Sequence, residues 1–437
     1  MLDSAWTLPT TRYPVAACLL RRAGFTVMSD EDEMRYAPFD STAGLVQRGR
    51  GLGAIQAAMD PAAAAPHVYD AIRRDWRWDS VDDRSRYLAR LIRDLELSPA
   101  PAIDLLAGTE QDCERATGVL ELLALAGSDE ARDALRSHIR EGAHWILVLE
   151  SVSDLWPPQW WEDLGEVART RIGAEGEPPW RSEPWTRFGI EIQRPRPQPT
   201  RPNLTTWGEE KLLALLADTR ADPSRKRDVL SELAHRPPLE GLIPLVPSLG
   251  TPDGGRALPQ LRLAVQNLGV LALSAAHRWA TDEREWLAGL GADVLADHLG
   301  PEVIPQLVAE LADQWHDRTW CGPQRTAKQL ARFGPAAAEA APLLQRFWLR
   351  TPHSYERPAY LEALAAIAPA GLDRARAESL WDCEDQARLL GIAHTPNSPQ
   401  ALEQITALRD DPMEDPGVRA AAQERLTADL TSPADHT

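Results

Sequence analysis

Cysteine is scarce in this chain of 437 residues. The four cysteines, Cys18, Cys113, Cys321 and Cys383, lie far apart, and no Cys-x-x-Cys pair occurs. A disulfide scaffold needs a higher cysteine density than this, and a typical structural zinc site needs paired cysteines. The spacing therefore indicates reduced thiols in a cytoplasmic protein.

Lysine is nearly absent, with three copies among 47 basic residues, and acidic residues number 65. The net charge of −18 repels phosphate backbones and anionic lipid, so nucleic acid and membrane are disfavoured as partners and basic proteins are favoured. Local basic patches would consist of arginine, whose planar fork suits carboxylate and phosphate. The excess of arginine over lysine is also typical of a GC-rich bacterial genome.

Long apolar runs are missing as well. No segment approaches about 18 uninterrupted apolar residues, and the first residues lack the basic start and apolar run of a signal peptide. We therefore expect a soluble cytoplasmic protein. Sustained alternation of apolar and polar residues, the mark of a half-buried strand, is also missing, so the sequence predicts an all-α fold.

Local catalytic motifs are absent too. The sequence has no Gly-x-Ser-x-Gly elbow, no His-Glu-x-x-His pair and no glycine loop ending in Gly-Lys-Ser/Thr. No catalytic residue, cofactor or metal is predicted on this basis. A non-enzymatic role is favoured, although catalysis stays open because triads assemble from distant residues.

The chain does contain an internal repeat. The stretch Leu330–Pro335 recurs at Leu364–Pro369, 34 residues later, and in both copies an apolar helix end is followed by a small residue, a proline and a second apolar stretch. A period of 20 to 50 residues with two helices is typical of an α-solenoid, in which each unit buries its apolar face against its neighbours.

Composition divides the chain into four parts. Residues 1–43 have no assigned role, residues 44–175 form a helical array, residues 176–206 are a linker or insertion rich in proline and tryptophan, and residues 207–437 form a second array. Asp60-Pro61 reads as an N-cap with proline at the first helical position, and Gly127-Ser128 ends one helix and caps the next. The strongly apolar stretch Leu261–Ala276 predicts one long interior helix.

The segment Asp415–Leu426 resembles the second helix of a HEAT repeat. It begins with aspartate and proline, and Val418 and Arg419 follow one turn later. The preceding stretch Ala401–Arg409 is similar to the first helix of such a repeat. The likeness is weaker from Gly300 to Ala393, and residues 44–175 match only as generic helical pairs. The resemblance implies an α–α superhelix of HEAT-like pairs in two arrays.

Tryptophan is unusually abundant, with 16 copies, seven of them between Trp145 and Trp207. Core packing explains many of these. Neighbouring helical residues point about 100° apart, so one of Trp160 and Trp161 should be partly exposed. An exposed tryptophan near arginine is a candidate hot spot. The candidate partner-binding residues are Trp156, Trp160, Trp161, Trp180, Trp185, Arg194 and Arg196.

Two weaker patterns also carry polar chemistry. Arg48-Gly49-Arg50-Gly51 precedes an expected helix and could bind an anion there, or its glycines could allow two helices to cross closely. Asp313, His316 and Asp317 share one helical face, where they could bind a metal or act as an acid–base pair, or simply form a polar corner between helices.

These features favour a scaffold or adaptor that binds a protein or peptide on the concave face of a HEAT-like solenoid. The alternative is a nucleic-acid-acting enzyme, since the chain also resembles HEAT-like DNA glycosylases. Those enzymes use a groove lined by aromatic residues and an aspartate. A similar function here would require a basic concave surface for nucleic acid, which the cluster of Arg194, Arg196 and Arg201 could supply. Some HEAT-like families are lyases or chaperones for cofactor-bearing proteins, but no residue here indicates a chromophore.

Arg419 is expected to be a structural residue, because an arginine within reach of a neighbouring unit's aspartate can form a ladder between repeats. We expect Arg419→Ala to lower the melting temperature slightly and to leave partner binding unchanged. Calorimetry of the full chain measures this, and an unaltered melting temperature would exclude the structural role.

Overall fold

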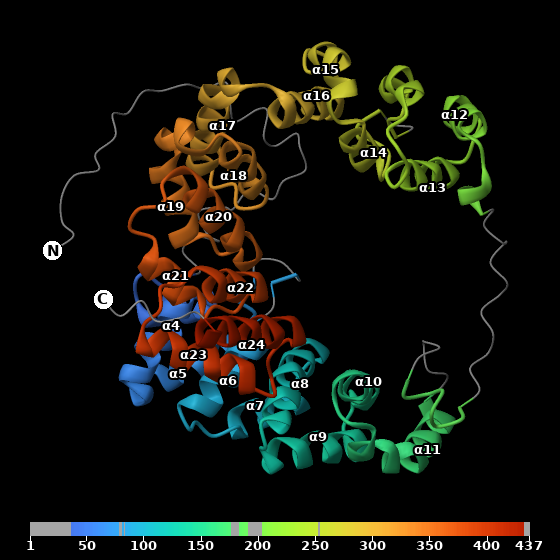
Figure 1. Cartoon of the computed structure of the whole chain (residues 1–437). Helices are drawn as coiled ribbons and strands as arrows, with labels where there is room; N and C mark the ends of the chain where they lie inside the picture. Colours follow the sequence, from blue (N-terminus) through green and yellow to red (C-terminus); the bar gives the residue numbers. More distant parts are fainter. Residues whose placement is uncertain are drawn as a thin grey trace. The chain divides into compact units, whose positions relative to one another are not determined.

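The structure is a computed structural model that describes residues 36–77, 81, 82, 84–175, 183–190, 203–251 and 254–431. Within these ranges every regular element is a helix, and an isolated antiparallel bridge joins Gly250 and Ala257 (Figure 1). The all-α prediction is therefore confirmed. None of the helices in the described ranges has the length and apolar character needed to cross a membrane.

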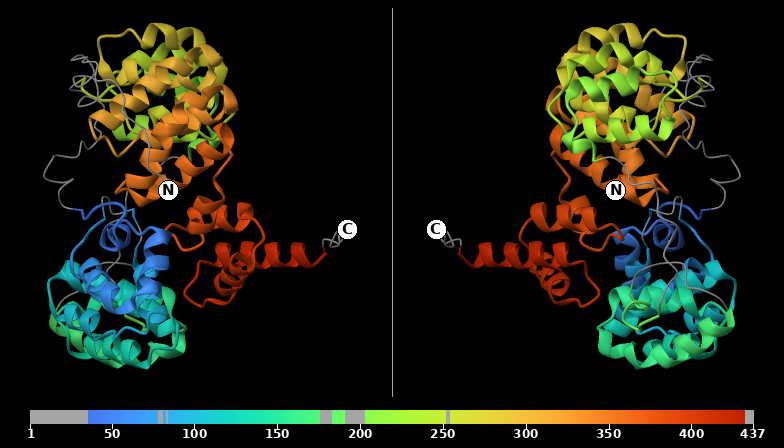
Figure 2. Two further views of the ribbon diagram at one scale, coloured as in Figure 1. Left: turned by 90° about the vertical axis from the view of Figure 1, so that its left-hand side faces the viewer. Right: turned by 90° about the vertical axis from the view of Figure 1, so that its right-hand side faces the viewer.

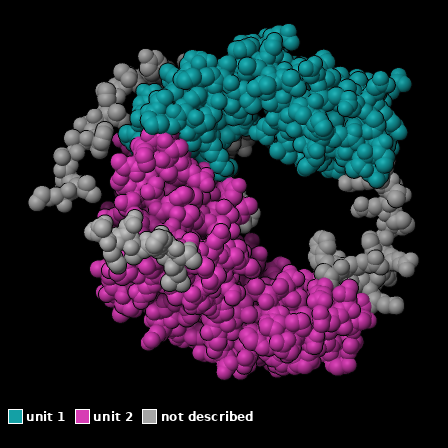
Figure 3. Space-filling view, viewed as in Figure 1, with its two compact units in different colours: residues 1–29, 197–343 teal, residues 30–196, 344–437 magenta. Residues whose placement is uncertain are grey.

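Residue contacts divide the chain into two compact units, which Figure 3 colours separately. Unit 1 comprises residues 1–29 and 197–343, and unit 2 comprises residues 30–196 and 344–437. This division differs from the one expected from composition, because residues 344–437 group with residues 30–196. Unit 2 is thus built from two segments far apart in the sequence.

Unit 1 is a succession of short helices. Asp222 caps one of them through a hydrogen bond from the Ser224 backbone N–H, and Pro223 occupies the first helical position. Its principal helices are α12 (Glu209–Ala217), α13 (Pro223–Leu233), η5 (Glu240–Ser248), α14 (Leu261–Leu268), α15 (Leu273–Trp279), α16 (Glu285–His298), α17 (Ile304–His316), α18 (Pro323–Ala331) and η8 (Gly334–Ala340). Contacts between sequence neighbours join α12 with α13, α13 with α14, α15 with α16 and α17 with α18.

The predicted long interior helix over Leu261–Ala276 is wrong. Gly269 adopts a φ of +56°, which ends α14, and the short 3-10 helix η6 (Gly269–Ala272) separates α14 from α15. A left-handed residue interrupts the hydrogen-bond ladder of an α-helix. The apolar content also misleads about burial, because Leu263, Val270 and Leu271 are exposed.

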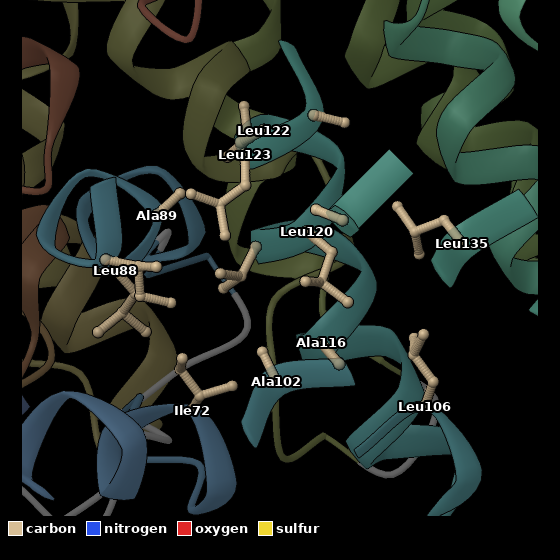
Figure 4. Close-up of a cluster of buried hydrophobic side chains, with 14 of the residues drawn as sticks. Ile72, Leu88, Ala89, Ala102, Leu106, Ala116, Leu120, Leu122, Leu123 and Leu135 are labelled. Atoms are coloured by element: carbon tan, nitrogen blue, oxygen red, sulfur yellow. The ribbon is translucent and has the colours of Figure 1, made fainter. Parts of the chain in front are cut away.

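Unit 2 begins with helices that surround one apolar core. Figure 4 shows Ile72, Leu88 and Leu120 gathered between α5, α6 and α8. The helices of the first segment are α3 (Thr42–Gln47), α4 (Gly51–Met59), α5 (Pro61–Arg73), α6 (Ser85–Asp94), α7 (Ala100–Asp104), η1 (Leu105–Ala107), α8 (Glu110–Leu125), α9 (Asp129–Glu141), α10 (Trp145–Leu155), η2 (Pro158–Trp160), η3 (Glu162–Leu164) and α11 (Gly165–Glu175).

The second segment of unit 2 adds α19 (Ala341–Arg350), which crosses the unit boundary, η9 (Ser354–Glu356), α20 (Arg357–Ile367), α21 (Asp373–Ser379), α22 (Asp385–His394), α23 (Pro399–Asp410) and α24 (Pro416–Thr431). Helices of residues 42–73, in blue, adjoin helices of residues 373–410, in red, in both views of Figure 2. Contacts between α4 and α21 account for part of this join.

The helix ends follow the expected capping rules. The Asp60 carboxylate accepts a hydrogen bond from the Ala63 backbone N–H at 3.1 Å, and Pro61 opens α5. Gly127 has a φ of +100° after α8, and the Ser128 hydroxyl caps α9. Both predictions are confirmed, because capping depends on residues adjacent in the sequence.

The segment Asp415–Leu426 also has the expected cap. Asp415 Oδ1 accepts hydrogen bonds from the backbone N–H groups of Gly417 and Val418, at 2.7 and 3.4 Å, where α24 begins. Arg419 Nε donates to the Arg409 carbonyl at 3.3 Å, at the end of α23. Arg419 therefore contacts the preceding helix through a backbone carbonyl.

A buried arginine near the start of each segment of unit 2 binds the other segment. Arg357, on α20, donates to the carbonyls of Arg48 and Gly49 at 2.8 and 3.2 Å and pairs with Asp382 through two hydrogen bonds. Guanidinium groups suit this role because their five N–H donors can serve several acceptors at once. The pairing compensates the cost of burying the charge.

The reciprocal contact comes from Arg50, immediately before α4. Its guanidinium donates to the Leu349 carbonyl at 3.0 Å, pairs with Glu378 at 2.5 Å, and stacks 4.3 Å from the centre of the Trp348 ring. A third contact joins α6 to the turn before α24, where Arg90 binds Asp411 and Glu414 at 2.8 and 2.5 Å.

Gly51 lies at a close approach between the two segments of unit 2. A Cβ atom at Gly51 would lie 1.9 Å from the Glu378 carbonyl oxygen, which is backbone and cannot swing away. We expect Gly51→Ala to destabilise unit 2 by at least about 2 kcal/mol, because overpacking at a rigid contact costs about 1–3 kcal/mol or more. Denaturant unfolding of the full chain measures this.

Gly289, within α16 of unit 1, is the matched control, because nothing lies within 4 Å of a Cβ atom there. Gly289→Ala should be neutral or stabilise its helix by up to about 1 kcal/mol. Equal effects of the two substitutions would contradict the tight contact at Gly51.

Candidate functional site

The glycine-rich segment Arg48–Gly51 lies at the join between the two segments of unit 2. Arg48 and Arg50 are both buried. The Arg48 guanidinium donates to the carbonyls of Ala37 and Gly44 at 3.1 and 3.0 Å, and Arg50 binds Glu378. Both guanidinium groups that could bind an anion are thus already hydrogen-bonded within the chain. The glycines fit the alternative prediction for this motif, a close crossing of two helices.

The predicted tryptophans lie mainly in the core. Trp156, Trp161 and Trp185 are buried, whereas Trp160 is half-buried. One member of the Trp160–Trp161 pair is therefore partly exposed, as the sequence predicts. The Trp185 indole donates to Glu150 at 2.7 Å, which holds the segment after α11 against α10. Trp180, Arg194, Arg196 and Arg201 lie outside the described residues.

Asp313, His316 and Asp317 lie at the C-terminal end of α17 in unit 1. Asp313 and His316 are exposed, and Asp317 is half-buried. Partial burial and the charge of Asp317 raise the pKa of Asp313. The two carboxylates therefore repel each other. A metal or acid–base role for this group stays a prediction.

A buried polar cluster of unit 2 contains residue types that sequence analysis did not connect. Asp82 Oδ1 lies 2.7 Å from His353 Nδ1 and accepts a hydrogen bond of 2.9 Å from the Ser354 hydroxyl. This hydroxyl contacts Glu384 as well. Asp82 lies 271 positions before His353 and 302 positions before Glu384, so no local sequence pattern connects these residues.

The buried polar cluster resembles a catalytic triad in composition but not in connectivity. In a triad, the serine hydroxyl donates to the histidine, whereas the Ser354 hydroxyl contacts the carboxylates of Asp82 and Glu384. Cys383, beside it, is buried, and burial raises the pKa of its thiol well above the ordinary value. A buried neutral thiol is a poor nucleophile. The cluster therefore serves the join between segments.

Proton sharing explains how two carboxylates fit around one hydroxyl. Ser354 has a single O–H, which can donate to one carboxylate only. The contact with Glu384 is satisfied when Glu384 is protonated and donates to the Ser354 oxygen. Consistent with this, burial raises the pKa of Glu384 to about 7. Asp82 stays ionised, because hydrogen bonding and charge from His353 outweigh its burial and hold its pKa well below the ordinary value.

A cavity of about 330 Å³ lies in unit 2 between the end of α5, the start of α6, and helices α8 and α10. Its apolar wall includes Ile72, Trp76, Leu88, Val119 and Leu147, and its polar wall includes Asp75, Arg77, Arg84, Ser85, Glu114, Arg115 and Ser151. Sequence analysis selected none of these residues, because each has ordinary neighbours and only the packing of four elements brings them together.

Comparison of the chain with models of protein families, with curated proteins and with solved structures finds no match. The functional reading therefore rests on the chain's own geometry.

The buried polar cluster makes the stability of unit 2 depend on pH. The folded pKa of Glu384, about 7, lies above its ordinary value of 4.5, so the folded state retains a proton that the unfolded state releases. The stabilisation is complete below pH 4.5 and disappears as pH rises through 7. We expect the free energy of unfolding to fall by about 2–3 kcal/mol between pH 5 and 8 from this group.

Urea unfolding at a series of pH values measures this slope. Glu384→Gln, which keeps the shape and a donor, should remove the contribution, whereas Asp385→Asn on the half-buried neighbouring residue should leave it intact. A wild-type slope in Glu384→Gln would show that another group causes the pH dependence.

Proposed function

We propose that this protein is a non-enzymatic interaction protein, built of HEAT-like helical pairs, that binds a protein or peptide. Successive helices pack pairwise along the chain, as in α8 with α9, α12 with α13, α17 with α18 and α23 with α24. This succession supports a repeat architecture, in which the surface of the array is the functional part. The residues with catalytic chemistry in the buried polar cluster are used internally, which supports a non-enzymatic role.

The observation that carries the proposal is the setting of Trp160. It is half-buried on η2, and Trp156 holds it edge-on at a ring separation of 5.6 Å. Exposed Leu155 and the half-buried Pro157 and Pro158 lie beside it in the sequence, and together the four residues 155, 157, 158 and 160 define the Trp160 surface. Rigid, partly exposed aromatics bind partners at low entropic cost.

The neighbourhood of the Trp160 surface indicates the chemistry of the partner. The Arg132 guanidinium carbon lies 5.4 Å from the Trp160 ring centre, so a cation of the chain itself already lies near this ring. Asp154, next to Leu155, is exposed, and the whole chain carries a charge of −18. A basic protein segment is therefore the favoured partner, because its lysine or arginine side chains can pair with the exposed Asp154 carboxylate beside this surface.

Trp160→Ala tests the proposal. We expect the full-length chain, purified from its native cell under gentle salt, to retain a partner in stoichiometric amount and Trp160→Ala to weaken that binding at least tenfold, as for a hot-spot tryptophan. Met59→Ala is the matched control, because Met59 is a strongly exposed apolar residue on α4, away from this surface in the sequence. Binding is measured with purified partner by calorimetry.

The melting temperature of each variant separates a loss of contact from a loss of fold. Undiminished binding by a folded Trp160→Ala variant would contradict the Trp160 surface. Failure of any protein to co-purify in stoichiometric amount would contradict the interaction role itself.

A further inference from the structure

The cavity between α5, α6, α8 and α10 contains one arginine that lacks an ionic partner. Arg77 pairs with Asp75 through two hydrogen bonds, at 3.0 and 2.9 Å, and Arg115 pairs with Asp112. Arg84 has no carboxylate within ion-pair distance among the described residues. Arg84 does interact electrostatically with the Asp82 carboxylate, beyond ion-pair distance, so its positive charge is only partly balanced within the described residues.

Arg84 is also deeply buried, with 5 % of its surface exposed. Two of its nitrogens donate to the carbonyls of Gln47 and Pro352. Its Nε has no acceptor in the described part of the chain. A buried charge is costly unless it is paired, and a buried donor without an acceptor adds to that cost. Because Arg84 also lines the cavity, an anion there could supply the missing acceptor.

The acidic groups of the chain near Arg84 do not replace such an anion. Asp82, two residues away, is bound by His353 and Ser354 in the buried polar cluster. Glu114 lines the same cavity but is exposed. Its charge disfavours a ligand with several negative charges, so the cavity suits a monoanion better than a phosphate.

The apolar wall determines the rest of the ligand. The Trp76 indole is buried and fixed by a 3.2 Å hydrogen bond to Asp70, and Ile72, Leu88 and Leu147 complete the wall. The volume of about 330 Å³ lies at the lower end of the range of about 300–1,000 Å³ for small-molecule sites. A small molecule with an apolar body fits this space, whereas a folded partner does not.

We propose that this cavity is a binding site for a small organic monocarboxylate, whose carboxylate pairs with Arg84 and whose apolar body contacts Trp76 and Leu147. The site shares no residue with the Trp160 surface, so it is independent of the proposed protein partner. Arginine and carboxylate form the charge-assisted pair that is the strongest of the common hydrogen-bonded contacts.

Calorimetric titration of the full-length chain tests the site with three probes: 3-phenylpropionate, its neutral amide 3-phenylpropionamide, and inorganic phosphate. We expect 3-phenylpropionate to bind at least tenfold more tightly than the amide and than phosphate. Equal binding of acid and amide, tighter binding of phosphate, or no binding of any probe would overturn the proposal.

Two variants locate the site. Arg84→Gln should reduce the affinity for 3-phenylpropionate to that of the amide, and Leu147→Trp should abolish the binding of both probes by filling the cavity. Leu147→Trp leaves Arg84 in place, so it decides the question even if Arg84→Gln fails to fold. Arg409→Gln is the charge-matched control, because Arg409 pairs with Asp410 on the surface of α23 and should leave binding unchanged.

A folded Arg84→Gln variant that still binds 3-phenylpropionate more tightly than the amide would show that the carboxylate binds elsewhere. Binding of 3-phenylpropionate by Leu147→Trp would show the same. Trp160→Ala should bind 3-phenylpropionate like the wild type, which separates this proposal from that of the protein partner.

Discussion

The hydrogen bonds from Arg357 to the carbonyls of Arg48 and Gly49 are the contact on which the rest of unit 2 depends. They fix the turn before α4 against the start of α20, and Asp382 neutralises the charge that this requires. Arginine is suited to this place because it stays charged when buried and offers several donors in one plane. Lysine has only three donors on one nitrogen, so it could not form the four hydrogen bonds that Arg357 makes to two carbonyls and both oxygens of Asp382.

This join determines which polar residues are available for function. Asp82, His353, Ser354 and Glu384 would read as catalytic groups if they faced solvent, but they lie inside the join and satisfy one another. The features left for binding lie at the margins of the core. Trp160 lies where a helix gives way to a 3-10 turn, and Arg84 lies just before α6, where the cavity opens between helices.

The sequence predicts what depends on neighbouring residues. The all-α class, the caps at Asp60, Ser128 and Asp415, and the partial exposure of one of two adjacent tryptophans follow from helical geometry. It does not predict the pairing of Arg50 with Glu378, because 328 positions separate them and an arginine before a glycine has many possible partners. The break at Gly269 was missed for a different reason, since a glycine inside an apolar run is compatible with both a continuous and an interrupted helix.

The residues that line the cavity could not be predicted from the sequence for the same reason. Its lining comes from positions 71 to 151, and only the angle at which α6 meets α8 brings Arg84 near Glu114. That Arg84 forms no ion pair within the described ranges is not visible in the sequence, where Asp82 and further acidic residues lie close by. Only a three-dimensional count of donors and acceptors identifies it.

The discontinuity of unit 2 has a consequence for biosynthesis. Arg50 leaves the ribosome 328 residues before Glu378, a delay of about 15 to 65 s at typical rates of translation. All of residues 203–343 emerge during this interval, so the helices of unit 1 can form while Arg50 and Arg84 are still in water. The nascent first segment must therefore stay soluble without its partner, and a premature stop before residue 344 would leave it permanently without the helices that cover it.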